Sequence, residues 1–241
     1  EQAGINNSII CGPGPSVDRI REKGLRVDII DMQHASLNLL KDSSSIKKLS
    51  LLLKNIGPDI VQTHNSKGGL IGTYAARKAK IPFIIHQAHG LLYKRFNGTK
   101  KQITRFVELK YFGNCDLLLF QNKDDLESIR KHRSDLGDKL LFVNNGIDFS
   151  DFSNSTKRKT PADEGILKLL CIARMDKNKN HEMIFRALEM MQEIVPFEIH
   201  LVGDGPLLVN YKSRISQSEK LRNRVVFHGF VDRRQISEIA S

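Results

Sequence analysis

Short apolar runs alternate with helical stretches along most of the chain, and this alternation constrains the fold most. Apolar runs bounded by Gly, Pro or polar residues predict strands at 8–11, 27–30, 60–64, 83–88, 117–120, 140–143, 168–173, 197–202 and 225–227. Helical spacing predicts helices at 17–23, 45–55, 69–79, 101–112, 124–132, 181–194, 206–216 and from 233 onward. Strands that alternate with helices imply an α/β protein with doubly wound parallel sheets.

A polar stretch without periodicity interrupts this series. We predict an N-terminal Rossmann-like domain over 1–150, whose first strand is missing, a linker over 151–165 and a second domain over 166–241. The second domain is shorter than the ~100–150 residues of a typical domain. We therefore expect it to be incomplete.

Three helices carry predictions about single positions. Ser44 or Ser45 is expected to cap the helix over 45–55, and Pro206 is expected in the first turn of the helix over 206–216. The apolar side of the helix over 101–112 is predicted to consist of Ile103, Phe106, Val107 and Leu109.

Positive charge is concentrated in one region of the chain. The stretch 43–115 holds thirteen Lys or Arg residues and two acids, Asp59 and Glu108, which accounts for the whole net charge of +11. Such a region attracts anions, for example a phosphorylated substrate, an acidic membrane face or nucleic acid. The alternative is a set of solvated helix faces that keep the protein in solution.

The cysteines and the apolar runs bound the class of protein further. Cys11, Cys115 and Cys171 are far apart and form no CxxC pair, so we expect buried core thiols in a reducing cytoplasm. No apolar run approaches the ~20 residues that a membrane span needs. The sequence therefore predicts no membrane-spanning helix.

Polar residues or glycines follow almost every predicted strand. Ligands of doubly wound sheets bind beyond the carboxyl ends of the strands, so these positions together predict a ligand cleft. Each position alone is weak evidence, because Gly and Asn also form turns. The segments concerned are 64–69, 89–90, 121–122, 144–146, 174, 203–206 and 228–229.

The segment 173–181 joins a predicted strand to the start of a helix. Arg174 offers a bidentate fork to phosphate and Lys179 offers a mobile point charge, so we predict that they hold a diphosphate near the helix N-terminus. The alternative is an exposed basic loop. The turn 203–206 contains two glycines, which either let the backbone approach a ligand or simply form a tight turn.

Several motifs of other enzyme classes are absent from the sequence. There is no P-loop, no GxGxxG after a strand, no HExxH and no Asp-x-Asp pair. We therefore expect no metal site, and the charge of a leaving phosphate would have to be offset by Arg and Lys.

His89 is the candidate catalytic residue, because it follows the strand over 83–88 and precedes a glycine. A neutral imidazole at this point can bond to a sugar hydroxyl or polarise a departing group; the alternative is a structural histidine. His64 ends the neighbouring strand and is expected to line the same wall. His86 lies within its strand and is expected to be structural.

Taken in order, several phrases of the sequence resemble the GT-B-fold retaining glycosyltransferases of family four, also called group 1. The phrases are 58–64 with 67–70, 85–91, 145–148, 173–181, 201–207 and 227–231. The resemblance implies a GT-B-like fold and a hexosyltransferase-type reaction with retention of configuration. A sugar would pass from a nucleotide-sugar donor to a saccharide or lipid-linked acceptor, in cell-surface polysaccharide synthesis. No metal and no cofactor are implied, since the nucleotide sugar is a substrate.

The resemblance also implies roles for single residues. Arg174 and Lys179 match the pair that binds the donor diphosphate, and His89 matches the histidine near the donor sugar. The turn near the nucleotide base is matched by Gly203, Asp204, Gly205, Pro206 and Leu207. The residues expected on the acceptor side are His64, Lys67, Lys94 and Arg95. The basic stretch suits a lipid-diphosphate acceptor and peripheral contact with an anionic membrane, at the inner face of the cytoplasmic membrane, with no nucleic acid as partner.

The sequence departs from the family pattern near both ends. No two glutamates have the Glu-x7-Glu spacing with which family members grip the donor, and the glycine-rich loop of the first strand is missing. We therefore expect a segment truncated at both ends and inactive alone. Two other classes stay open: a GT-B-like sugar-nucleotide epimerase or phosphorylase, and a basic nucleic-acid-binding protein, which only the net charge favours.

Overall fold

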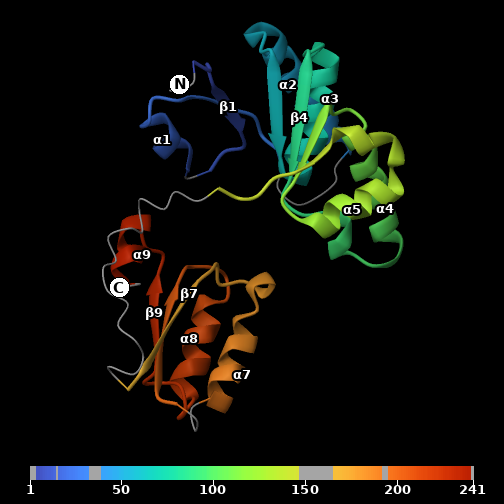
Figure 1. Ribbon diagram of the computed structural model, residues 1–241. Helices are drawn as coiled ribbons and strands as arrows, with labels where there is room; N and C mark the ends of the chain where they lie inside the picture. Colours follow the sequence, from blue (N-terminus) through green and yellow to red (C-terminus); the bar gives the residue numbers. More distant parts are fainter. Residues whose placement is uncertain (1–3, 15, 33–38, 147–164, 192–194, 240–241) are drawn as a thin grey trace. The chain divides into compact units, whose positions relative to one another are not determined.

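The computed structural model describes residues 4–14, 16–32, 39–146, 165–191 and 195–239. The chain forms two compact units, 1–145 and 146–241 (Figure 1). The predicted linker over 151–165 lies outside the described residues, apart from Gly165.

The first unit is a parallel α/β structure. Its elements in chain order are β1 (Ser8–Cys11), α1 (Ser16–Arg21), β2 (Arg26–Ile29), α2 (Leu39–Ile56), β3 (Ile60–His64), α3 (Asn65–Ala79), β4 (Phe83–Ala88), η1 (Leu92–Arg95), α4 (Gly98–Phe112), β5 (Leu117–Phe120), α5 (Lys123–His132), η2 (Ser134–Lys139) and β6 (Leu140–Phe142). β1 pairs with β2, and β3, β4, β5 and β6 form a four-stranded sheet in that order, with every pairing parallel. Because the strands of this sheet are parallel, the residues that follow them lie along one edge.

The second unit has a three-stranded parallel sheet in the order β7-β8-β9. Its elements are β7 (Leu167–Ile172), η4 (Lys177–Lys179), α7 (His181–Met191), β8 (Phe197–Val202), α8 (Leu208–Gln217), β9 (Val225–Gly229) and α9 (Arg233–Ile239). α7 and α8 cover one face of this sheet (Figure 1). Phe185 and Tyr211 of these helices share one buried cluster with Ile199 and Leu201 of β8. The predicted α/β class with parallel sheets is confirmed in both units.

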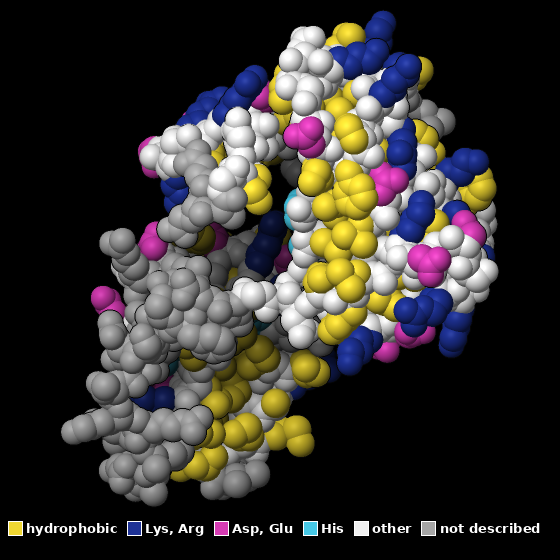
Figure 2. All heavy atoms as spheres, turned by 45° about the horizontal axis from the view of Figure 1, so that its top comes forward, with side chains coloured by type: hydrophobic (Ala, Val, Ile, Leu, Met, Phe, Trp, Pro, Cys, Tyr) yellow, Lys and Arg dark blue, Asp and Glu magenta, His cyan; other side chains and the backbone are white. Residues whose placement is uncertain are grey.

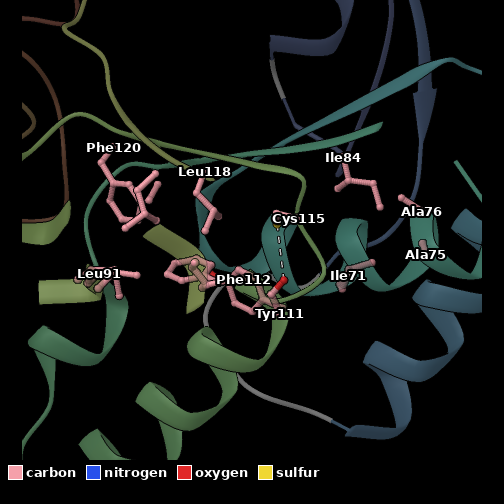
Figure 3. Close-up of a cluster of buried hydrophobic side chains, with 14 of the residues drawn as sticks. Ile71, Ala75, Ala76, Ile84, Leu91, Tyr111, Phe112, Cys115, Leu118 and Phe120 are labelled. Atoms are coloured by element: carbon pink, nitrogen blue, oxygen red, sulfur yellow. Dashed lines mark hydrogen bonds between the residues drawn. The ribbon is translucent and has the colours of Figure 1, made fainter. Parts of the chain in front are cut away.

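Buried side chains from α3, β4, α4 and β5 form the core of the first unit (Figure 3). Phe112 and Phe120 are fully buried and meet edge to face, with ring centroids 6.0 Å apart. Cys115 is buried beside them, and burial raises the pKa of its thiol to about 12. The predicted core position is confirmed for Cys115, whereas Cys11 and Cys171 are only half-buried.

The cap predicted for the helix over 45–55 is wrong. α2 is already helical at Leu39, so neither Ser44 nor Ser45 is its N-cap. Ser45 lies within α2, where its Oγ donates to the carbonyl oxygen of Asp31 at 2.9 Å. This bond ties α2 to the segment that follows β2.

The start predicted for the helix over 206–216 is wrong as well. α8 begins at Leu208, and Pro206 lies in the turn before it. The reason is a hydrogen bond to another segment, since the N–H of Leu207 donates to the carbonyl oxygen of Met175 at 3.0 Å. The turn is therefore shaped by its bond to the chain after β7 rather than by the helix.

The buried face of α4 differs from the predicted one. Ile103 and Phe106 are 54% and 67% exposed, although Val107 and Leu109 pack partly against the core. The residues that α4 buries are Thr104, Glu108, Tyr111 and Phe112. The pattern misled because a buried glutamate reads as a surface residue in the sequence.

Close packing of α3 makes Gly69 a position where any side chain is costly. A Cβ there would lie 2.6 Å from Cε1 of His86 and 2.7 Å from Cε2 of Tyr111. We expect Gly69→Ala to lower the free energy of unfolding of the first unit by about 1–3 kcal/mol in urea denaturation. The control is Gly68→Ala on the same helix, where a Cβ meets nothing within 4 Å and alanine should add about 0.5–1 kcal/mol. Equal effects of the two substitutions would contradict the close packing.

Candidate functional site

The neighbouring strands β3, β4 and β5 bring two histidines and an amide together at their carboxyl ends. Nδ1 of His64 lies 3.2 Å from Nε2 of His89, and the two rings stack with their centroids 5.5 Å apart. Nδ1 of His89 lies 3.0 Å from Oε1 of Gln121, whose Nε2 donates to Oδ1 of Asn145. Partial burial, and secondly the neighbouring His89, lower the pKa of His64. The structure thus joins His64 and His89 in one hydrogen-bonded chain.

A third histidine, His86, lies within β4 and is buried in the core of the first unit. It is 1% exposed and shares a hydrogen bond of 2.8 Å with Oγ1 of Thr63 through its Nδ1. Its ring meets those of Tyr111 and Phe112 at centroid distances of 5.4 and 5.5 Å. Burial, and to a lesser degree the charges of His64 and His89, lower the pKa of His86 to about 3. His86 is therefore a neutral core residue, as expected.

A cavity of about 960 Å³ in the first unit is lined by His89 and by residues of α3, η1 and α4, whereas the lining does not include His64. Its apolar walls come from Leu70, Leu92, Phe96, Ile103 and Val107. Three cations, Lys67, Arg95 and Lys100, also line it. Its remaining lining includes the polar residues Asn65, Ser66, Thr99, Thr104, Glu108 and Tyr111. The cavity thus combines apolar walls with positive charge, which suits an amphiphilic anion.

A buried carboxylate organises one wall of this cavity. Glu108 is 2% exposed, and it accepts hydrogen bonds from the backbone N–H groups of Leu92 (3.0 Å) and Tyr93 (2.9 Å) and from Oγ of Ser66 (3.2 Å). Burial raises the pKa of Glu108, and these donors oppose the shift. Glu108 therefore fixes the start of η1, and with it the loop that carries His89.

The cations predicted on the acceptor side lie in different surroundings. Lys67 lines the cavity and its Nζ bonds to Oδ1 of Asp42 on α2. Arg95 also lines the cavity. Lys94 is outside the lining, and its Nζ bonds to Oδ1 of Asp125 on α5 at 2.6 Å. Regional charge alone therefore overstates the charge that faces the cavity.

In the second unit the chain after β7 forms backbone hydrogen bonds with the turn over 203–207. The N–H of Met175 donates to the carbonyl oxygen of Asp204 at 2.9 Å. Gly203 and Gly205 have φ of 140° and 158°, and a Cβ on them would lie 2.1 Å from the oxygen of Ala173 and 2.5 Å from that of Met175. These two glycines are therefore required by the protein's own backbone.

The loop between β7 and α7 exposes its cations and buries its ends. Met175 and His181 are fully buried, whereas Arg174 and Lys179 are exposed. Asp176 lies between the two cations: its Oδ1 accepts from the N–H of Asn178 at 3.0 Å, and its Oδ2 lies 3.3 Å from Nε of Arg174. A loop anchored in this way leaves both Arg174 and Lys179 accessible to solvent.

Within the described ranges, no group of three or more His, Cys, Asp or Glu side chains is arranged to hold a metal ion. None of the helices that the structure describes is both long and apolar enough to cross a bilayer.

The comparisons with known proteins agree with the resemblance of the sequence. Residues 1–151 match the family model described as Glycosyltransferase Family 4, and residues 152–241 match Glycosyl transferases group 1. The chain therefore belongs to the family 4, group 1 glycosyltransferases. Similar solved structures include HepE of Anabaena with UDP and glucose (TM-score 0.66, 16% identity, 92% of this chain and 60% of that chain). A glycosyltransferase from Rickettsia africae (TM-score 0.69, 18% identity, 96% and 62%) is also similar, which confirms the GT-B-like fold.

Two curated relatives act on lipid-linked sugars, as their names state. One is the UDP-Gal:alpha-D-GlcNAc-diphosphoundecaprenol alpha-1,3-galactosyltransferase of Escherichia coli, 29% identical over 95% of this chain and 62% of its own length. The other is the N,N'-diacetylbacillosaminyl-diphospho-undecaprenol alpha-1,3-N-acetylgalactosaminyltransferase of Campylobacter jejuni, 32% identical over 37% of this chain and 24% of its own length. The chain thus spans about three fifths of the first relative.

The residues around Glu108 were missed by the sequence analysis. Ser66, Glu108 and Tyr111 line the cavity, yet none is a predicted site residue. One signal was present: Glu108 is one of two acids in a stretch with thirteen cations. An isolated acid in a basic helix is a candidate for a buried, partnered carboxylate.

The buried His86 predicts an acid-sensitive first unit. The folded chain keeps this imidazole neutral down to about pH 3, whereas the unfolded chain protonates it near pH 6.5. Stability should therefore fall as the pH drops from 6.5 towards 3, by up to ~1.4 kcal/mol per pH unit from this group. His86→Gln should make the fall shallower in urea unfolding, and His132→Gln, at an exposed position, should not. Equal slopes in the wild type and His86→Gln would refute the buried neutral imidazole.

Proposed function

We propose that this chain functions in a hexosyltransferase of cell-surface polysaccharide synthesis. The enzyme would move a sugar from a nucleotide-sugar donor to a saccharide carried on a lipid diphosphate, with retention of configuration. The observation that carries the proposal is the cavity lined by His89, with apolar walls and the cations Arg95 and Lys100; the charge of Lys67, which also lines it, is offset by Asp42. A lipid diphosphate has the same two properties, an apolar chain and negative charge. The names of both curated relatives describe acceptors of this kind.

On the donor side, we assign the diphosphate to Arg174 and Lys179 and the nucleotide base to the turn over 203–207. The exposed, anchored loop supports this assignment, because a diphosphate needs accessible cations in a fixed position. In the proposed reaction the acceptor oxygen bonds to the anomeric carbon as the bond from that carbon to the donor phosphate breaks. The acceptor proton passes to the leaving phosphate. The proposal invokes no metal and no cofactor.

The alternatives considered from the sequence are less well supported. An epimerase or phosphorylase would share the fold, but the two matching family models describe glycosyltransferases and together span the chain. Nucleic-acid binding rested on net charge alone, and two of the basic residues concerned, Lys67 and Lys94, bond to carboxylates.

We also propose that α4 contacts the anionic inner face of the cytoplasmic membrane. Ile103 and Phe106 are exposed on α4, and the same helix carries Lys100, Lys101 and Arg105. Figure 2 shows one face of the molecule, on which hydrophobic side chains lie among Lys and Arg side chains. A helix with exposed apolar and basic side chains favours the interface of an acidic membrane.

Donor binding is the first test of the proposal. Arg174→Ala and Lys179→Ala should each weaken the binding of UDP roughly tenfold to a hundredfold in calorimetry, since a bond to a charged group contributes ~1.5–3 kcal/mol. Lys177→Ala removes the same charge from the same exposed loop and should change the affinity far less. If all three variants weaken binding equally, the loop acts only through its net charge and the assigned pair is wrong.

Membrane contact is tested by flotation with liposomes. Phe106→Ser should bind vesicles that contain phosphatidylglycerol several-fold less than the wild type, because an apolar anchor outside the cavity lining is lost. Leu51→Ser is the control, since Leu51 is an exposed apolar residue on α2 and is 55% exposed, against 67% for Phe106. Retained flotation of Phe106→Ser would exclude α4 as the contact.

A further inference from the structure

The cavity of the first unit differs in charge from one end to the other along α4. Lys100 and Glu108 both line it, and the eight positions that separate them correspond to about 12 Å of helix rise. Lys100 belongs to the first turn of α4, close to Arg95 of η1, whereas Glu108 belongs to the second half of the helix. The cavity therefore has a basic end and an end that holds a carboxylate.

The basic end combines positive charge with an apolar wall. Nζ of Lys100 lies 4.2 Å from the centroid of the Phe96 ring, and Arg95 precedes Phe96 in the chain. Arg95 and Lys100 are both exposed, so their charge is accessible to a ligand in the cavity. Ile103 adds apolar surface one turn further along α4. Phosphate groups followed by the first carbons of a lipid chain suit this end.

The other end of the cavity is polar and has no excess of positive charge. Oγ of Ser66 donates to Glu108, and the charge of Lys67 is offset by Asp42. Asn65, next to Ser66, is exposed and lines the cavity, and its amide offers both donors and an acceptor. An amide of this kind suits the hydroxyls of a sugar, whereas the carboxylate of Glu108 disfavours a phosphate.

The polar end also lies at the carboxyl edge of the sheet. Asn65 directly follows β3, and His89, which lines the cavity as well, directly follows β4. Ligands of doubly wound sheets bind at this edge. The sugar is the part of a lipid-linked acceptor that reacts, so it is expected at this end of the cavity.

We propose that the cavity binds a lipid-diphosphate sugar in one orientation. The sugar bonds to the amide of Asn65, and the diphosphate lies between Arg95 and Lys100. The first carbons of the lipid chain contact Phe96 and Ile103. This inference rests on the proposed function, because that function supplies the acceptor.

The backbone of Asn65 allows its side chain to be removed without strain. Asn65 has a φ of 61°, in the left-handed region that glycine adopts readily, so Asn65→Gly deletes the amide alone. Lys80→Gly is the matched control, because Lys80 is the C-cap of the same helix and has a φ of 60°. Arg95→Ala and Lys100→Ala are compared with Lys110→Ala, at an exposed position of α4 outside the cavity lining.

The test is calorimetry on the full chain with two probes of equal charge. One is N-acetylglucosaminyl octyl diphosphate, and the other is methyl octyl diphosphate, in which a methyl group replaces the sugar. Asn65→Gly should weaken the sugar-bearing probe roughly threefold to tenfold, as expected for one neutral hydrogen bond, and leave the methyl probe unchanged. Arg95→Ala and Lys100→Ala should each weaken both probes by the same factor, roughly tenfold to a hundredfold. Lys80→Gly and Lys110→Ala should leave both affinities near those of the wild type.

The opposite orientation gives the opposite pattern and would overturn the inference: Asn65→Gly would weaken both probes, and Arg95→Ala only the sugar-bearing one. Full affinity of Asn65→Gly for the sugar-bearing probe would overturn it too, as would a wild type that binds that probe but not the methyl probe. In each of these cases the wild type still binds the sugar-bearing probe, so the proposed function stands. A wild type that binds neither probe would instead refute the proposed function.

Discussion

Parallel pairing of β3, β4 and β5 is the constraint on which the site of the first unit depends. It places the residues after three strands at one edge, so that side chains separated by 25 and 32 positions in the sequence reach hydrogen-bond distance. One shift of register would move His64 away from His89. The chain of bonds from His64 through His89 and Gln121 to Asn145 is therefore a consequence of sheet register rather than of any local motif.

The sequence predicted the strands well and the helix faces unevenly. Continuous apolar runs such as 117–120 have few alternative interpretations, and the strands lie within a residue or two of the predicted ranges. The face of α4 was missed because its buried Glu108 is partnered by backbone N–H groups of Leu92 and Tyr93, sixteen and fifteen residues away. No periodicity reveals such donors. The meeting of His64 and His89 at one sheet edge could be expected from strand order, but the contact between Nδ1 of His64 and Nε2 of His89 required coordinates.

The glycines of the second unit show how one pattern can serve two purposes. Gly203 and Gly205 were expected either to approach a ligand or to form a tight turn. Their missing side chains make room for the backbone at Ala173 and Met175, and this tie in turn holds the loop that carries Arg174. A substitution at either glycine would therefore disturb the proposed diphosphate loop as well as the turn to which we assign the nucleotide base. Arg174 and Lys179 are the residues whose substitution tests the ligand itself.

The lysines of the first unit differ in their surroundings, and only some of their charge is available to a ligand. Lys67 and Lys94 bond to carboxylates, so their charge is offset within the protein. Lys100 is placed differently: its Nζ lies 4.2 Å from the centroid of the Phe96 ring, and both residues line the cavity. A cation held over an aromatic wall puts positive charge directly beside an apolar surface. That is the geometry required where the diphosphate of a lipid meets its hydrocarbon chain, and it explains why a cavity with apolar walls, rather than a uniformly basic groove, best matches the acceptor that we propose.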